Sequence, residues 1–302
     1  MTDQPDSAAW RRVDTPVDET LYDAADAGGT PVAVGGGGTA LRRADGDWHA
    51  VLEDGVAANG YALCAADATD AGDRVWVAGE SGAFGTYELG GARTHDYSAP
   101  GGNTTTFVAV AAVGDAGSET VFVGDDDGAV TVITPGGGSP TVDRTTRPPN
   151  GDEIVGIGAR GDDAVVVTGD GFLCRTADGR DWSTTDLGTA LETTVAAGAA
   201  AADRTVAVSH EGDGCVVTAA GDVLLDSLAG TDVSDVATDG AEVVTVGGSG
   251  GVYRRTLDGY VVADTATDAT LHGVALSDPA VAVGSSGTVL EATNAVPLAS
   301  DN

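Results

Sequence analysis

One pentapeptide, Gly247-Gly-Ser249-Gly-Gly251, matches the G-x-S-x-G pattern that presents a nucleophilic serine in many hydrolases. That chemistry requires a turn from a strand into a helix, and an acid and a histidine further along the chain. Here the pentapeptide lies between two β-forming runs, and Ser81 and Ser286 occupy similar turns elsewhere. We therefore interpret it as a structural turn, and we predict no catalytic residue.

Histidines and a run of aspartates could in principle bind metal ions. The four histidines are His49, His95, His210 and His272. They are widely separated and have no cysteine pair nearby, whereas a zinc site needs three or four converging ligands. Asp125-Asp-Asp-Gly128 could hold a hard cation through its carboxylates, but a chain with 37 Asp also produces such runs as ordinary acidic turns. We predict no metal site and no cofactor.

Arginine is scarce in this chain, so its positions are the better guide to a binding surface. Counted from the glycine of the preceding turn, Arg42, Arg175 and Arg255 share the fifth place of a predicted third strand. Arg43 and Arg254 adjoin that position, and Arg147 precedes a stiff Pro-Pro-Asn turn. These six are the candidate partner-binding residues. The alternative, that each arginine only pairs with a neighbouring carboxylate, stays open.

The charge balance excludes several classes of function. The chain has 47 acidic residues against 14 basic ones, a formal net charge of −33, and no lysine. A field this negative repels phosphate, so nucleic-acid binding and attraction to anionic lipid are disfavoured. Without lysine there is no P-loop and no Schiff-base chemistry. The surplus of Asp resembles the proteins of salt-accumulating haloarchaea, in which molar salt screens the repulsion between carboxylates.

The cellular setting is predicted from the N-terminus and the cysteines. Arg11-Arg12 is followed by polar residues rather than an apolar stretch, so it does not form an export signal. The small-apolar run at residues 196–202 is too short to span a bilayer. Three widely spaced cysteines indicate no disulfide framework. We expect a cytoplasmic monomer that does not insert into a membrane.

A repeat carries most of the information about fold. Each copy has a short β-forming run, a glycine-containing turn and a second β-forming run, as in Val75-Trp-Val-Ala-Gly79-Glu-Ser-Gly82. The anchors are Gly35, Gly79, Gly124, Gly169, Ser209, Gly247 and Gly284, on average 41.5 residues apart. The glycines expected at positive φ in the turns are Gly38, Gly82, Gly128, Gly171, Gly214, Gly251 and Gly287. This period is typical of propeller blades, including those of WD-like repeats.

The pattern predicts an all-β fold, a seven-bladed β-propeller of four-stranded antiparallel blades in one domain over residues 1–302. The blades are expected at about residues 20–54, 58–99, 104–146, 152–187, 191–228, 232–266 and 269–293. The first strand of each blade is rich in Ala and Gly, which suits the crowded axis of a ring. The seventh copy lacks a fourth strand, so we predict that residues 6–14 complete it and close the ring.

Two segments carry a family resemblance. Gly38-Thr-Ala-Leu-Arg-Arg-Ala-Asp-Gly-Asp-Trp48 and Asp170-Gly-Phe-Leu-Cys-Arg-Thr-Ala-Asp-Gly-Arg-Asp-Trp182 resemble the repeats of photosystem II assembly-factor-like propellers and of the wider BNR (Asp-box) family. The Asp-to-Trp spacing is shorter than in the usual Asp-box, and five blades lack the aromatic residue. The chain also resembles uncharacterised haloarchaeal propellers. The resemblance implies a rigid disc that holds another protein, with arginines as part of the partner-binding surface.

Three functions remain open on the sequence. The first is a non-enzymatic scaffold that binds a protein or peptide, and it needs no special constellation of residues. The second is a glycosidase-like or lactonase-like propeller hydrolase, which should bring carboxylates and arginines together at the mouth of the channel. The third is a sensor that binds a small ligand or ion in the channel. We predict the scaffold.

Overall fold

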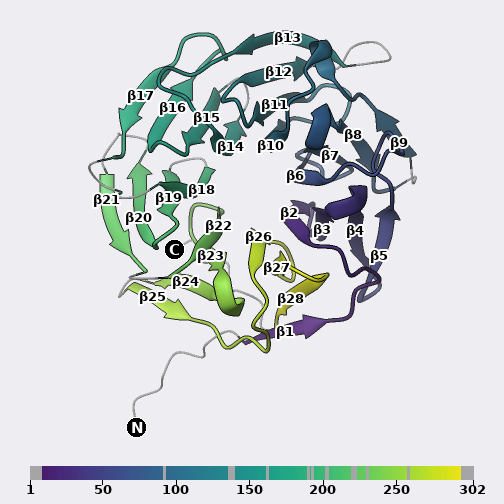
Figure 1. The fold of residues 1–302 in the computed structure, drawn as a ribbon, viewed down its shortest axis with the longest axis vertical. Helices are drawn as coiled ribbons and strands as arrows, with labels where there is room; N and C mark the ends of the chain where they lie inside the picture. Colours follow the sequence, from purple (N-terminus) through teal and green to yellow (C-terminus); the bar gives the residue numbers. More distant parts are fainter. Residues whose placement is uncertain are drawn as a thin grey trace.

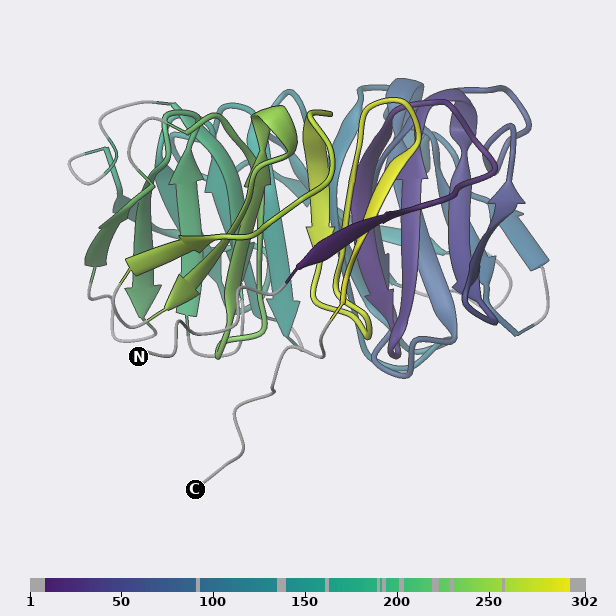
Figure 2. The same cartoon turned by 90° about the horizontal axis from the view of Figure 1, so that it is seen from below.

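The computed structural model describes residues 9–90, 93–134, 140–160, 163–188, 191, 194–200, 204–218, 223–228, 231–256 and 259–293. In this part of the chain, twenty-eight strands form seven four-stranded antiparallel sheets around a central axis (Figure 1). Seen from the side, the sheets form a thick disc (Figure 2). The prediction of a seven-bladed propeller is confirmed. None of the described residues forms a helix long and apolar enough to cross a membrane.

Each blade runs outward from an inner first strand to an outer fourth strand. Blades 1 to 4 consist of β2 (Leu21–Ala27), β3 (Thr30–Gly35), β4 (Ala40–Ala44), β5 (Asp47–Leu52); β6 (Leu63–Ala68), β7 (Arg74–Gly79), β8 (Phe84–Glu88), β9 (Arg93–Asp96); β10 (Phe107–Val113), β11 (Thr120–Asp125), β12 (Val130–Thr134), β13 (Thr141–Thr146); β14 (Ile154–Arg160), β15 (Asp163–Thr168), β16 (Phe172–Thr176), β17 (Ser183–Asp186). Blades 5 to 7 consist of β18 (Val195–Ala200), β19 (Arg204–Ser209), β20 (Asp213–Thr218), β21 (Val223–Ser227); β22 (Val233–Thr238), β23 (Val243–Gly247), β24 (Val252–Thr256), β25 (Gly259–Val262); β26 (Leu271–Ala275), β27 (Val281–Gly284), β28 (Thr288–Ala292), β1 (Trp10–Val13).

The hydrophobic core lies between the blades. Seven clusters of buried residues each join two neighbouring blades, so that every interface around the ring has its own apolar layer. The second strand of each blade is mainly apolar and has buried residues on both faces, as with Val32, Ala33 and Val34 in blade 1. Since each blade covers its neighbours, no blade buries its apolar surface alone.

The turn between the second and third strands explains the repeated glycines. In blades 1, 2, 6 and 7 the second strand ends in glycine; a Cβ on Gly247 would lie 1.8 Å from the carbonyl oxygen of Asp232. In blades 3, 4 and 5 this place is taken by Asp125, Thr168 and Ser209, whose side-chain oxygens accept the N–H four residues on. The same turn is therefore built either by close backbone approach or by a polar cap.

The glycine expected at positive φ follows three residues later in all seven turns. It is Gly38, Gly82, Gly128, Gly171, Gly212, Gly250 and Gly287. The predictions of Gly214 and Gly251 were wrong because the turn keeps one length in every blade, which places Gly212 and Gly250 at that position.

The N-terminal strand closes the ring. β1 pairs antiparallel with β28, with Trp10 opposite Ala292 and Val13 opposite Val289, and is the outer strand of blade 7. Trp10 is 5% exposed and lies in the core cluster between blades 6 and 7. Its backbone N–H donates to the backbone carbonyl of Asp264 in blade 6 at 3.0 Å. The predicted closure by the N-terminal strand is confirmed.

A buried carboxylate ties this closure to blade 1. Glu291 of β28 is 1% exposed; its Oε1 accepts from Arg43 Nε at 2.7 Å and from Trp48 Nε1 at 3.1 Å. Its Oε2 accepts from Arg11 Nη2 on β1 at 2.8 Å. Glu291 therefore joins the first strand of the chain, the last strand and the first blade at one point.

We expect Glu291→Ala to lower the free energy of unfolding by ~3–5 kcal/mol, because it leaves the half-buried Arg43 and the buried Trp48 donors without their acceptor. Arg11→Ala is the matched control. The Arg11 side chain is 58% exposed, so its loss should cost less than ~1 kcal/mol. Denaturant unfolding measures both, and equal small losses for the two variants would contradict the role given to Glu291.

Candidate functional site

Two of the predicted arginines reach from a third strand to the neighbouring blade. Arg42 Nη1 donates to the carbonyl of Leu89 in blade 2 at 2.7 Å. Arg175 Nη2 lies 3.5 Å from the carbonyl oxygen of Thr218 in blade 5. Both stand opposite the corresponding valine of the second strand, as does Arg254 in blade 6, so Arg254 rather than Arg255 is their equivalent.

The other candidates also have partners within the chain. Arg43 binds Glu291, and Arg254 forms an ion pair with Glu242. Arg147 donates to the carbonyl of Asp127, at the turn between β11 and β12, and Arg255 also has a partner. The six arginines thus lie in blades 1, 3, 4 and 6 and do not form one patch.

Arg175 does line a substantial groove where blade 4 meets blade 5. The cavity measures about 740 Å³, and it lies at the ends of β14 and β16 and the beginnings of β15 and β19. Arg160, Arg175 and Arg204 line it together with Trp182. Two carboxylates, Asp163 and Asp181, line it as well, so among the described lining residues there are three arginines and two acids.

The groove combines charge with an apolar body. Arg160 is exposed, and Arg175 and Trp182 are half-buried. Trp182 Nε1 donates to Thr146 Oγ1 of blade 3 at 3.2 Å, and the indole packs against the core between blades 3 and 4, so Trp182 borders the groove while its side chain is held on the side of blade 4 that faces blade 3. Arginine and tryptophan are the residue types that carry most binding energy at protein interfaces, and guanidinium groups recognise carboxylates through paired hydrogen bonds. The groove can therefore receive an acidic or carboxylate-bearing segment.

Sequence reasoning did not identify Arg160 or Arg204 as site residues. They end a first strand and begin a second strand in successive blades, so they stand 44 residues apart in the chain. Their meeting depends on how blade 5 sits against blade 4. The signal in the sequence was their position, because each adjoins the turn between strands 1 and 2 of its blade. Arg175 adjoins the turn between strands 3 and 4, which lies on the same face of the ring.

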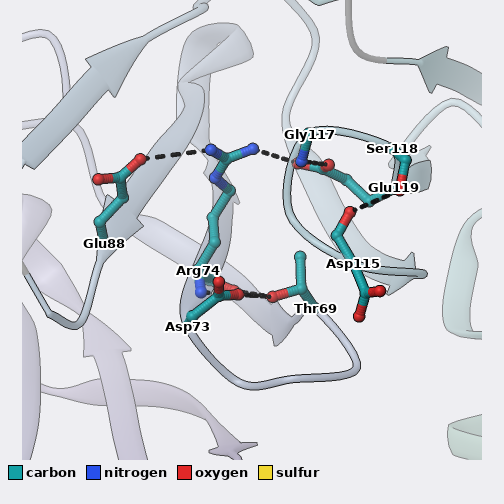
Figure 3. Close-up of polar contacts among 8 residues, drawn as sticks. All are labelled: Thr69, Asp73, Arg74, Glu88, Asp115, Gly117, Ser118 and Glu119. Carbon is teal, nitrogen blue, oxygen red and sulfur yellow. Dashed lines mark hydrogen bonds and ion pairs between the residues drawn. The ribbon is translucent and has the colours of Figure 1, made fainter.

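A further arginine shows how these side chains can be purely structural (Figure 3). Arg74 Nη1 donates to Glu119 Oε1 of blade 3 at 2.5 Å, and Arg74 Nη2 donates to Glu88 Oε1 at 3.3 Å. Glu119 is fully buried and also accepts the N–H of Gly117. Beside it, Thr69 donates to Asp73 at 2.8 Å. This cluster fixes blade 2 to blade 3 through both terminal nitrogens of Arg74.

The central channel is a second cavity, of about 560 Å³. The first strands of all seven blades line it, as the Ala- and Gly-rich sequences predict. Asp23, Asp67 and Asp235 contribute carboxylates, and Tyr22 and His272 lie near one another with ring centroids 6.1 Å apart. The described lining residues include no arginine, so the arrangement sought for a propeller hydrolase is not found among them.

Three of the channel aspartates, Asp23, Asp67 and Asp235, accept hydrogen bonds from backbone N–H groups of the next blade. Asp23 Oδ2 accepts from Ala66 N and Asp67 Oδ2 accepts from Ala112 N, both at 2.8 Å; Asp235 Oδ2 accepts from Val274 N at 2.9 Å. Burial raises the pKa of Asp23 to about 6 and that of Asp67 to about 7, against the lowering effect of these hydrogen bonds. The pKa of Asp235 is raised by burial and by the charge of Asp23.

The remaining sequence candidates take structural positions. Ser249 lies in the turn Gly248–Gly250 between β23 and β24, with φ 55° and no helix after it. Asp125 Oδ2 accepts from Asn103 Nδ2 at 2.9 Å and its Oδ1 caps the turn, so both oxygens are occupied. His272 Nε2 and Ser285 Oγ are hydrogen-bonded at 3.0 Å. The described residues contain no group of three or more His, Cys, Asp or Glu that could hold a metal ion.

Comparison with solved structures finds other propellers of low sequence identity. The structure of U3-55K matches with a TM-score of 0.77 and 11% identity, over 96% of this chain and 100% of that one. YCF48 from Cyanidioschyzon merolae matches with a TM-score of 0.71 and 17% identity, over 94% and 98%. YCF48 bound to D1 peptide matches with 0.72 and 15%, over 98% of both chains. No family model matches, and no curated protein matches.

Proposed function

We propose that this protein is a non-enzymatic propeller scaffold that holds a protein or peptide partner in the groove between blades 4 and 5. The observation that carries the proposal is the gathering of Arg160, Arg175, Arg204 and Trp182 around one cavity, in a chain with a net charge of −33. Elsewhere, Arg42, Arg43, Arg74 and Arg254 bind their own chain. In the groove, Arg160 is exposed, so an acidic segment of a partner can reach its guanidinium group.

The setting we propose is a halophilic cytoplasm, with the protein as a monomer that does not bind nucleic acid. The charge supports this, since a carboxylate-rich surface stays soluble when molar salt screens its repulsion. Structural neighbours support a role in protein binding: one solved propeller of this shape is YCF48 bound to D1 peptide, and another belongs to the mitotic checkpoint complex. The resemblance to Asp-box repeats rests on blades 1 and 4 alone.

Affinity purification at molar KCl from a halophilic host tests the groove. We expect one stoichiometric partner on the wild-type protein, identified by mass spectrometry, and its loss from the double variant Arg160→Ala/Arg175→Ala. Calorimetry with the identified partner should then show at least about a tenfold loss of affinity, as for removal of interface arginines. Arg180→Ala is the matched control, because Arg180 is exposed in the same blade but does not line the groove. No partner, or a partner that the double variant retains, would contradict the proposal.

A further inference from the structure

The outer strands of blades 5 and 6 carry an exposed apolar surface. Large hydrophobic side chains that are exposed in the described chain are Tyr22, Tyr61, Val223, Leu224, Leu225 and Val262. Four of these six lie on β21 and β25, which are the outermost strands of neighbouring blades (Figure 1). Leu225 is 67% exposed and Leu224 is 53% exposed. We call Val223, Leu224, Leu225 and Val262 the outer apolar surface.

The strand register shows which interface between blades Leu224 and Val262 adjoin. Leu224 stands opposite Val216, which packs in the core between blades 5 and 6. Val262 stands opposite Tyr253 on β24, and Tyr253 stands opposite Thr245 on β23. The neighbouring pair, Val246 and Val252, packs toward blade 7. Val262 therefore lies on the other face of blade 6, which faces blade 5. Leu224 and Val262 therefore flank the outer end of the same interface between blades 5 and 6. The apolar layer of that interface continues outward to the surface.

β21 is also an open sheet edge. The sheet order of blade 5 ends at β21, so one side of its backbone has no strand beside it in the described chain. Three other outermost strands carry charged or hydroxyl side chains: β9 reads Arg-Thr-His-Asp, β17 reads Ser-Thr-Thr-Asp and β1 reads Trp-Arg-Arg-Val. Such residues protect an edge against pairing with another strand. β21 reads Val-Leu-Leu-Asp-Ser, so its first three residues lack that protection.

We propose that an extended segment of a partner protein pairs with β21 as a fifth strand of blade 5. Apolar side chains at alternate positions of that segment share one face and would cover Leu224 and Val262. Asp213 lies at the end of this edge, where its Oδ1 accepts from Ser227 Oγ at 3.2 Å, so a basic residue at the end of the segment complements it. A second copy of this chain is the weaker occupant, because it brings another charge of −33.

The test uses a fluorescein-labelled peptide, Arg-Val-Thr-Val-Thr-Val-Thr-Arg, and fluorescence anisotropy at the lowest KCl concentration at which circular dichroism shows the protein folded. We expect saturable binding to the wild-type protein. The double variant Leu224→Thr/Leu225→Thr keeps β-forming residues, and we expect it to weaken binding at least about tenfold. A peptide with proline at its fourth position, which cannot donate a strand hydrogen bond there, should bind at least about tenfold more weakly as well.

Two controls separate this surface from the groove and from self-association. Tyr61→Thr removes an exposed apolar side chain elsewhere and should leave peptide binding unchanged, as should Arg160→Ala/Arg175→Ala. Absence of peptide binding, or equal binding by the Leu224/Leu225 variant, would overturn the proposal. If light scattering shows a dimer of the wild-type protein that this variant loses, a second copy occupies the edge and the proposed partner strand is wrong.

Discussion

Deletion of residues 1–14 should abolish the cooperative thermal unfolding of this protein and leave an aggregation-prone chain. The deletion removes β1, and with it every backbone hydrogen bond between β28 and its outer neighbour. It also removes Trp10 from the core between blades 6 and 7 and Arg11 from Glu291. Since neighbouring blades stabilise one another in a ring, the loss at one joint exposes an apolar edge that other chains can pair with.

Circular dichroism and size-exclusion chromatography at molar KCl measure this outcome. Arg12→Ala is the matched control, because Arg12 lies on the same strand but is exposed. It should change the free energy of unfolding by less than about 0.5 kcal/mol, as is usual for a surface substitution. A deletion variant that stays monomeric and melts at the wild-type temperature would show that the closure contributes nothing to stability.

The fold could be predicted because its determinants are local. A turn glycine follows each second strand at a fixed interval, and the backbone geometry that requires it involves only residues of one hairpin. The unpaired Trp10-Arg-Arg-Val13 segment and the incomplete seventh copy together predict the closure, since an open edge must find a strand. Strand number, order and blade count followed from these short patterns.

The site was harder to predict because it depends on contacts between blades. Arg175 was identified from its place in the repeat, but Arg160 and Arg204 meet it only through the packing of blade 4 on blade 5. Glu291 was missed for the same reason. In blade 7 it occupies the position that Arg42 holds in blade 1, and its carboxylate binds Arg43 of blade 1. The repeat in the sequence shows where each of these residues stands in its own blade. The residues that it contacts belong to the neighbouring blade, and the repeat does not identify them.

The channel aspartates were also missed, although they leave a signal in the sequence. Asp23, Asp67 and Asp235 stand within first strands that otherwise consist mainly of small and apolar residues. A carboxylate in such a strand must find donors, and each of these finds a backbone N–H of the next blade. Because the chain has 37 Asp, the residue type alone does not distinguish these three from the others.

These buried aspartates should make the protein more stable in mild acid than at neutral pH. Burial raises the pKa of Asp67 from 3.8 to about 7. Below about pH 4 the carboxyl is protonated in both the folded and the unfolded chain. As the pH rises to about 7, the unfolded chain loses this proton while the folded one keeps it, so stability falls. Since each pKa unit corresponds to about 1.4 kcal/mol, Asp67 accounts for about 4 kcal/mol of this loss.

Asp23 acts in the same direction, because burial raises its pKa from 3.8 to about 6. The free energy of unfolding, measured with denaturant at pH 4 and pH 8, should therefore drop by several kcal/mol in the wild-type protein. Asp67→Asn cannot ionise, so the drop should shrink by about 4 kcal/mol, even though one backbone donor loses its acceptor.

Asp178→Asn is the control of opposite sign. Backbone N–H groups of Asp181 and Arg180 lower the pKa of this exposed carboxyl below 3.8, so its titration lies at or below the lower end of this pH range. Its replacement should leave the drop between these two pH values unchanged. If Asp67→Asn shows the full wild-type drop, the pH dependence arises from the surface carboxylates, whose mutual repulsion also weakens in acid, and Asp67 is ionised in the folded ring.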